Sequence, residues 1–299
     1  MKKIFLLFCI STLLSSCEKD IDFETQKQEA VLVVDGIIED GKMPQIVLTK
    51  SLDYFANITP QIALNSFARN AIVSISNGST THILKEYEQN LGLGYKAFYY
   101  SIDSSNPSTA FVGEQGKTYT LKINFENKEY QSTTTIPILT KTCDSLWWKK
   151  DDNIKDCDTC VIMTGKFTDP PLLGNYIRYF TKVNSEPFFA GEKSAFDDQV
   201  VNGTTYNAEI NKSLDRNLPN NKDNKYPYPT SFLKGDTITL KLCNTDKATY
   251  NFWNTWEFAY QAIGNPFSTP TKVISNISNN ALGAFCGYSV QYKTLIIPK

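Results

Sequence analysis

The sequence contains a single histidine, His82, and this scarcity excludes several kinds of catalytic and metal site. A serine or cysteine hydrolase needs a histidine base or a substitute for it, and no Gly-x-Ser-x-Gly motif is present. A glycine-rich loop of the kind that holds phosphate groups is missing as well. Because His82 follows a hairpin turn signal, we expect it to be a partly exposed strand residue without a catalytic role.

An excess of positive charge is also missing. Without Lys2 and Lys3, which belong to the N-terminal segment described below, 28 basic side chains stand against 31 acidic ones. A nucleic-acid-binding protein presents a basic face, so we expect no nucleic-acid partner. The acidic pairs Asp151-Asp152 and Asp197-Asp198 lie in polar stretches, where solvated charge is the default interpretation. We therefore predict no catalytic residue, no metal site, no cofactor and no enzymatic activity.

Long apolar runs are absent except near the N-terminus. Residues 4–14 are almost entirely apolar, but this run is shorter than the roughly 20 residues that a membrane-spanning helix needs. A short positive end followed by such a run is typical of a secretory signal peptide. Its end, Leu14-Ser15-Ser16-Cys17, resembles the bacterial lipobox, in which the cysteine thiol is diacylated and the chain is cut before it. The resemblance implies a signal peptide over residues 1–16; the alternative is an ordinary signal peptide with an incidental cysteine.

Lipid attachment at Cys17 would make residues 17–27 a lipidated tether. Two or three acyl chains hold a protein durably on a bilayer, whereas a single chain gives only marginal binding. Beyond the signal peptide no apolar segment reaches membrane-spanning length. We therefore expect a folded body that the lipid alone anchors in the membrane.

Seven cysteines are present, of which Cys9 leaves with the signal peptide and Cys17 carries lipid. An exported protein meets oxidising conditions, so some of the others are expected to pair. Cys157-Asp-Thr-Cys160 has the spacing of a redox motif or of half a zinc site, but a βαβ context and further zinc ligands are missing. A local disulfide between Cys157 and Cys160, or a pair of thiols, is the favoured interpretation. Five is an odd number, so at least one of the remaining cysteines lies outside any bridge within the chain. The five are Cys143, Cys157, Cys160, Cys243 and Cys286.

Alternation of apolar and polar residues dominates residues 28–138, which we assign to a first domain. In the stretch "GKTYTLKINF", Tyr119, Leu121 and Ile123 fall on one face of a strand. Asn77-Gly78 after "AIVSIS" is a strong hairpin signal, and Glu126-Asn127-Lys128 marks another turn. Short alternating strands with turns between them predict a β-sandwich of immunoglobulin-like or transthyretin-like type.

Residues 139–299 are less regular, and we assign them to a second, β-rich domain with one helix. Asp246 can cap the start of that helix, and Gly264 can end it. We place it near residues 246–263, because apolar residues recur there at helical spacing: Phe252, Trp256, Ala259 and Ile263. Strands are predicted over residues 146–148, 161–167, 176–183, 236–243 and 285–294. The expected fold class is therefore mainly β.

Aromatic side chains are abundant, and some of them occur in neighbouring positions. Phe252, Trp253 and Trp256 are expected in the core, where a lone helix packs on a sheet. Aromatic faces with a polar edge also suit sugar, peptide and protein surfaces. Four residues are therefore candidates for binding a partner, two of them in the proline-rich stretch "KYPYP": Trp147, Trp148, Tyr226 and Tyr228.

Three stretches together resemble a large family of uncharacterised Bacteroidota outer-membrane lipoproteins. They are "VLVVDGIIEDGKMPQIVLTKS", "GKTYTLKINFENKEYQSTTTIP" and the terminal "NPFSTPTKVISNISNNALGAFCGYS". The resemblance spans nearly the whole mature chain and implies an accessory role beside a TonB-dependent outer-membrane transporter. The charged residues after the lipobox, Glu18-Lys19-Asp20, are similar to the export signal that sends such lipoproteins to the cell surface.

The leading hypothesis is therefore a non-catalytic outer-membrane lipoprotein, displayed at the cell surface, that helps a TonB-dependent transporter capture its substrate. A structural or adhesive surface lipoprotein that binds proteins or glycans is the second hypothesis, and a secreted hydrolase is the third. The class of ligand, whether small molecule, peptide or glycan, stays open at this point.

Overall fold

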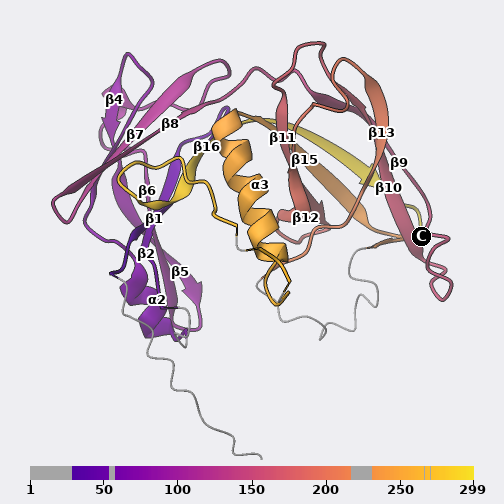
Figure 1. Cartoon of the computed structure of the whole chain (residues 1–299), viewed down its shortest axis with the longest axis horizontal. Coiled ribbons are helices and arrows are strands. Elements are labelled where there is room, and N and C mark those ends of the chain that lie inside the picture. The colour runs from indigo at the N-terminus through magenta and orange to yellow at the C-terminus, as the bar shows by residue number, and fades with distance from the viewer. Residues whose placement is uncertain (1–28, 54–57, 217–230, 266, 270) are drawn as a thin grey trace, which may run out of the picture.

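The computed structural model describes residues 29–53, 58–216, 231–265, 267–269 and 271–299. In these ranges the protein is mainly β, as predicted from the alternating sequence pattern, with two α-helices. Figure 1 shows two groups of strands, one at each side, with the longer helix between them. Cys17, Glu18, Lys19, Asp20, Tyr226 and Tyr228 lie outside the described residues.

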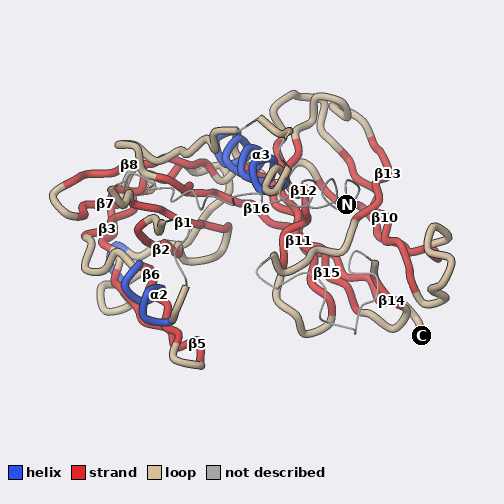
Figure 2. The backbone as a smooth tube through the Cα atoms, turned by 60° about the horizontal axis from the view of Figure 1, so that its bottom comes forward, coloured by secondary structure: helices blue, strands red, loops and turns tan. Residues whose placement is uncertain are grey.

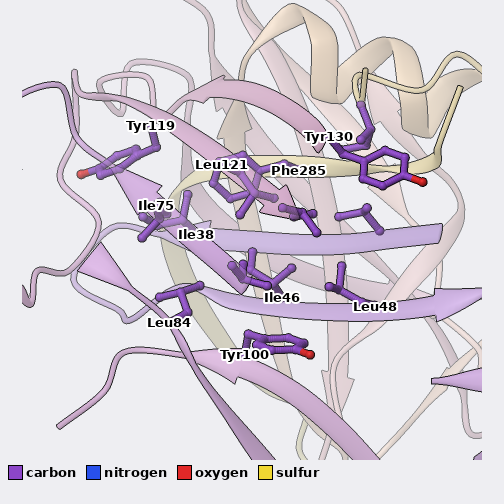
Figure 3. Close-up of a cluster of buried hydrophobic side chains, with 14 of the residues drawn as sticks. Ile38, Ile46, Leu48, Ile75, Leu84, Tyr100, Tyr119, Leu121, Tyr130 and Phe285 are labelled. Carbon is purple, nitrogen blue, oxygen red and sulfur yellow. The ribbon is translucent and has the colours of Figure 1, made fainter. Parts of the chain in front are cut away.

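The first group of strands is a sandwich of two sheets. One sheet has the order β4-β3-β7-β8, and it packs on β1, β2 and β6 of a second, larger sheet. Asn77 and Gly78 lie in the turn between β3 and β4, and Glu126 and Asn127 form the turn between β7 and β8, both at positive φ. Figure 3 shows side chains from both sheets, including Ile38, Ile75 and Leu121, meeting in the core. The strands are β1 (Leu32–Glu39), β2 (Gln45–Lys50), β3 (Ile72–Ser76), β4 (Thr81–Ile83), β5 (Lys85–Gly92), β6 (Tyr95–Ser101), β7 (Thr118–Phe125) and β8 (Lys128–Thr135).

The second group of strands forms another sandwich. Strand β10 lies between β13 and β9 and also pairs with the short β14, and this sheet packs on β11 and β15. Met163 and Phe167 from β10 meet Leu240 from β15 in a buried core. The strands are β9 (Thr142–Lys150), β10 (Cys160–Thr168), β11 (Tyr176–Val183), β12 (Phe189–Phe196), β13 (Thr205–Ile210), β14 (Phe232–Leu233), β15 (Thr237–Thr245) and β16 (Leu282–Ile296).

The last strand, β16, belongs to both sandwiches. Its first half pairs in parallel with β1, from Val33↔Leu282 to Glu39↔Tyr288, and its second half pairs antiparallel with β15. One eight-stranded sheet results, in the order β12-β11-β15-β16-β1-β2-β6-β5, and Figure 2 shows β16 between β1 and the strands of the second group. The boundary that we placed at residue 138 falls between β8 and β9, but hydrogen bonding in the shared sheet continues across both halves.

The long helix α3 (Lys247–Gln261) is close to the range predicted for it. The Asp246 carboxylate accepts a hydrogen bond from the Thr249 amide and caps the helix start. Phe252, Trp253 and Trp256 pack on the shared sheet, as expected for core residues. Among the described residues no helix is long and apolar enough to cross a membrane.

A second helix, α2 (Pro60–Ser66), was not predicted. The side chain of Thr59 accepts a hydrogen bond from the Ile62 amide, and Pro60 stands at the first helical position, where its missing N–H is not needed. None of its residues is buried, so the helix has no apolar face that periodicity could reveal. A short 3-10 helix over Pro107–Thr109 completes the regular structure.

Strand pairing defines two opposite ends of the molecule. Strand β1 begins at Leu32, just after the residues expected to form the tether, and ends at Glu39, opposite Tyr288. Tyr288 pairs with Thr245, and Thr245 pairs with Tyr176 at the start of β11. The loop before β11 is therefore level with the end of β1 and remote from its start, in the upper part of Figure 1.

Candidate partner-binding site

Two loops meet at the upper end of the second sandwich. One joins β10 to β11 (residues 169–175), and the other joins β12 to β13 (residues 197–204). Pro170 and Pro171 prevent the first loop from continuing a strand, because proline has no N–H to donate to a sheet. The two loops are hydrogen-bonded through their backbones: the Asp169 amide donates to the Thr204 carbonyl at 3.0 Å.

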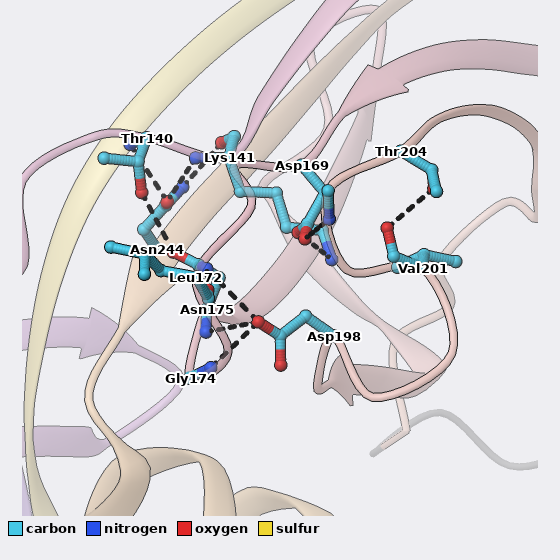
Figure 4. A network of polar contacts seen from close by, with 11 residues as sticks. Thr140, Lys141, Asp169, Leu172, Gly174, Asn175, Asp198, Val201, Thr204 and Asn244 are labelled. Atoms are coloured by element: carbon cyan, nitrogen blue, oxygen red, sulfur yellow. Dashed lines mark hydrogen bonds and ion pairs between the residues drawn. The ribbon is translucent and has the colours of Figure 1, made fainter.

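Asp198 lies in the second loop and holds the first loop in place through hydrogen bonds. Its carboxylate accepts hydrogen bonds from the amides of Gly174 and Asn175, both at 2.9 Å, and from the Asn175 side chain at 3.2 Å (Figure 4). Burial alone would raise the pKa of Asp198, but the hydrogen bonds from Asn175 and Gly174 outweigh it and hold the pKa below its usual value. The expectation that the Asp197-Asp198 pair is solvated is wrong for Asp198, which is buried and acts as a loop clamp.

A buried ion pair lies beneath the loops. The Lys141 ammonium lies 2.8 Å from a carboxylate oxygen of Asp169, and both side chains are almost fully buried. The backbone of Lys141 is fixed by Asn244, whose side chain accepts from the Lys141 amide at 2.9 Å and donates to its carbonyl at 2.8 Å. Separating the partners of such a pair would leave an uncompensated charge in the interior. The pair therefore holds Asp169, the first residue of the first loop, beside Lys141.

Three apolar side chains project from these fixed loops into solvent. Leu172 is 77% exposed, Leu173 is also exposed, and Val200 on the second loop is 92% exposed. We call Leu172, Leu173 and Val200 the apolar platform. Exposed apolar groups on a rigid scaffold are typical of a protein–protein contact, since binding buries them with little loss of backbone freedom. The arrangement can therefore bind an apolar surface of a partner.

Sequence reasoning missed the platform. Leucines within "DPPLLGN" do not alternate, and their neighbours exclude a strand. The signal that could have found them is this pair of apolar residues inside a segment bounded by prolines and a glycine, where no core strand can run. Val200, beside Val201 in an otherwise polar stretch, has no flanking proline and carries no such signal.

Trp147 and Trp148, the two described members of the four aromatic residues predicted to bind a partner, are not part of the platform. Trp147 and Trp148 lie on β9 opposite Thr164 and Met163, further from the loops than Thr142, which pairs with Thr168. Trp147 is partly exposed, whereas Trp148 packs against the core of the second sandwich. Side chains alternate between the two faces of a strand, so adjacent tryptophans could not both face a partner.

His82 is fully buried, so the expectation of a partly exposed strand residue is wrong. Its Nε2 accepts a hydrogen bond from the Asp103 amide at 3.0 Å, and its Nδ1 lies 2.8 Å from the Thr109 hydroxyl. The ring is therefore neutral, with the proton on Nδ1 donated to Thr109. With both nitrogens engaged, His82 has a structural role and is not poised as a general base.

The expectation that the Asp151-Asp152 pair is solvated is wrong for Asp151. It is buried, and its carboxylate accepts a hydrogen bond from the Asn153 amide at 3.1 Å at the start of the charged loop. Cys157 follows in this loop and is joined by a disulfide to Cys160, the first residue of β10. The described residues hold no cluster of histidine, cysteine or carboxylate side chains suited to a metal ion.

The most enzyme-like group of side chains lies beneath α3. The Ser194 hydroxyl donates to the Glu257 carboxylate and accepts from Arg178 Nε at 3.1 Å. The Arg178 guanidinium also lies 3.3 Å from the centre of the Trp253 ring. Ser194 is fully buried, and both its amide and its hydroxyl donate to Glu257. This cluster therefore fixes α3 to β11 and β12, and no substrate reaches its hydroxyl.

Two hollows line the first sandwich. One, of about 230 Å³, lies beside Lys50, Glu126 and Tyr130; the other, of about 500 Å³, lies between β8 and residues 275–278. The second is lined mainly by hydroxyl and amide groups. Ligand pockets are mostly apolar with a few convergent polar groups, so these hollows favour a small-molecule site less than the loops favour a partner.

Comparison with known proteins gives one match. The family model described as "Domain of unknown function (DUF4249)" matches residues 18–294. No curated protein and no solved structure matches the chain. The expected membership of a domain-of-unknown-function family is thereby confirmed. The match covers nearly the whole chain, and the chain therefore belongs to the DUF4249 family.

Proposed function

We propose that this protein is a non-catalytic lipoprotein, anchored in the outer membrane through Cys17 and displayed at the cell surface, that assists a TonB-dependent transporter in substrate capture. The lipobox supports the anchor, and the charged residues Glu18, Lys19 and Asp20 support surface display. The resemblance to Bacteroidota outer-membrane lipoproteins supports the transporter as partner.

The apolar platform is the structural observation that carries this proposal. It is built on loops that Asp198 and the Lys141–Asp169 pair hold in place. It lies at the end of the molecule remote from Leu32, where the chain emerges toward its anchor. A tethered protein that presents rigid apolar side chains away from its anchor is suited to bind another protein at the same membrane.

Two further observations agree with a binding role. The single histidine has both ring nitrogens engaged, and Ser194, whose hydroxyl donates to the Glu257 carboxylate, is fully buried. Neither group meets the geometric requirement of a base or nucleophile that a substrate can reach.

Co-purification in mild detergent tests the proposal. The tagged protein is recovered from its own outer membrane together with the variant L172S/L173S/V200S and the control I83S, which removes an apolar side chain of 64% exposure on β4. A TonB-dependent transporter should accompany the wild type and I83S in near-equal amount. The triple variant should lose it by about tenfold or more, since each 1.4 kcal/mol of contact changes affinity about tenfold.

Recovery of the wild type alone, under conditions that preserve other complexes of this kind, would contradict the proposal. That result would favour the structural or adhesive lipoprotein, which binds proteins or glycans without transport.

A further inference from the structure

A turn of unusual composition lies at the end of the molecule where β1 begins. Strands β5 and β6 are joined through Leu91-Gly92-Leu93-Gly94, and the side chain of Leu93 is 97% exposed. Leu93 has φ +52°, in the left-handed region that a leucine rarely adopts. Leu91 is exposed as well. The two-residue turn between Gly92 and Tyr95 itself requires positive φ at Leu93 and Gly94, but it does not require an apolar side chain. The exposure of Leu91 and Leu93 therefore indicates a contact outside the chain.

Strand direction places this turn beside the start of β1. Leu32 pairs with Lys50 at the end of β2, and β6 runs antiparallel to β2 through Ile46↔Tyr100. The first residue of β6, Tyr95, therefore lies toward the Lys50 end. Leu52 and Ile58 follow β2 and are exposed at the same end.

A second apolar group lies toward the same lower end of the molecule, at the end of α3. The helix starts at Asp246, which accepts hydrogen bonds from Thr134 and Thr135 at the upper end, and it runs downward in Figure 1 to the level of β5. Phe267, in the segment after the helix, is 95% exposed, and Ile263 is also exposed. The lower ends of β5 and α3 both lie in the lower part of Figure 1, and Figure 2 shows the two elements well apart.

The tether fixes which side faces the membrane, and this step rests on the lipid anchor of the proposed function. Residues 17–27 span at most about 40 Å when fully extended. The chain enters the body at Glu29, next to Val31, whose amide donates to Ser51 just before Leu52. The short tether therefore keeps the edge that carries Leu93 close to the bilayer.

We propose that Leu91, Leu93, Ile263 and Phe267 insert into the interfacial layer of the bilayer that holds the lipid anchor. Apolar side chains at two separated points of the lower end, together with the anchor, restrict rotation of the body about its tether. The platform then points away from the membrane. The occupant of this edge is lipid, because the anchor brings the edge to the bilayer whatever protein is bound.

Fluorescence quenching by lipid tests the proposal in the full-length lipidated chain. L93C and F267C carry an environment-sensitive fluorophore, and I83C and L173C at remote exposed sites are the matched controls. The proteins are reconstituted in vesicles of phosphatidylethanolamine and phosphatidylglycerol that contain a nitroxide lipid. Probes at positions 93 and 267 should be quenched several-fold more than those at 83 and 173.

Equal quenching at all four positions of a lipidated, vesicle-bound protein would overturn the inference and leave the anchor intact. Shielding of the probes at positions 93 and 267 from solvent, seen only in native membranes that contain the transporter, would show that protein covers this edge. That result would also overturn the inference. A Cys17 peptide without lipid in mass spectrometry, with no vesicle association, would instead contradict the proposed function itself and remove the basis of the inference.

Discussion

Glu39 in β1 and Lys241 in β15 form an ion pair across the shared strand β16. The Lys42 ammonium lies 2.5 Å from the other carboxylate oxygen of Glu39 and donates to the Tyr292 hydroxyl at 3.2 Å. The Glu39 side chain is buried, so one carboxylate joins strands of both sandwiches. The hydrogen bonds of the shared sheet and this ion pair together hold the two halves in a fixed orientation.

The substitution E39Q should lower the free energy of unfolding by about 1–3 kcal/mol, because Lys241 would lose its buried counter-charge. Urea unfolding at neutral pH measures the change. The control is E126Q, which breaks the exposed Lys50–Glu126 pair and should cost less than about 1 kcal/mol. Equal effects of the two substitutions would contradict the role of Glu39.

The contribution of Glu39 should also depend on pH. Burial alone would raise the pKa of Glu39, but the hydrogen bonds from Lys241 and Lys42 outweigh it and hold the pKa below its usual value. A depressed folded-state pKa contributes stability above the unfolded-state pKa of about 4.3 and loses it as pH falls through the folded-state value. The difference in unfolding free energy between wild type and E39Q should therefore be constant near neutral pH and shrink below about pH 4. A difference that grows with acidification would refute this assignment.

Asp246 makes a second connection between the halves. One carboxylate oxygen caps α3 through the Thr249 amide, and the other accepts from the Thr134 hydroxyl and the Thr135 amide, each at 2.8 Å. We expect D246A to cost about 2–3 kcal/mol of unfolding free energy. D246N keeps an oxygen for the helix cap but places an amide group against β8, so it should cost less than D246A. No loss in D246N would show that the contact to β8 contributes nothing, whereas equal losses in the two variants would show that the helix cap contributes nothing.

The three free cysteines in the part of the chain that the structure describes should be unreactive in the folded protein. All are buried, and burial raises the pKa of Cys243 to about 12 and those of Cys143 and Cys286 to about 11. Because the thiolate is the reactive form, iodoacetamide at about pH 8 should leave these thiols unmodified in the native state. Peptide mass spectrometry with and without urea measures this. Rapid labelling of any of the three without denaturant would contradict the packing described above.

Loss of the Asp198 clamp should release the loop that carries Leu172 and Leu173. In D198A three hydrogen bonds to Gly174 and Asn175 disappear, and we expect cleavage in residues 169–175 by a non-specific protease to accelerate by about tenfold or more. The neighbouring D197A is the matched control, since Asp197 accepts a hydrogen bond from the Tyr250 hydroxyl at 3.3 Å and does not clamp the first loop. Equal cleavage rates in the two variants would show that Asp198 does not hold the loop.

Local patterns predicted much of the fold. Tyr119, Leu121 and Ile123 alternate in sequence and are buried together, and Asp246 begins the helix that its capping chemistry indicated. The parallel pairing of Val33 with Leu282 was not predictable, because contacts between distant strands leave no periodic signal in either strand. The same limit applies to His82, whose partners Asp103 and Thr109 belong to a different loop.

The candidate site was less accessible to sequence reasoning than the fold. The platform depends on Asp198 reaching a loop more than twenty residues earlier, and a carboxylate in a polar stretch gives no sign of burial. Aromatic residues attract attention as contacts, but Trp148 shows that adjacent tryptophans in a strand serve opposite faces. Exposed apolar residues in a proline-rich loop are the more informative feature here.

The most direct test of the central claim is photo-crosslinking in intact cells. A photoreactive amino acid replaces Leu173 on the platform or, as the control, Ile83 on β4. Crosslinking from position 173 should attach the protein to a TonB-dependent transporter, whereas position 83 should give no such adduct. Adducts with the transporter from both positions alike, or from neither, would contradict the account that the platform binds the transporter.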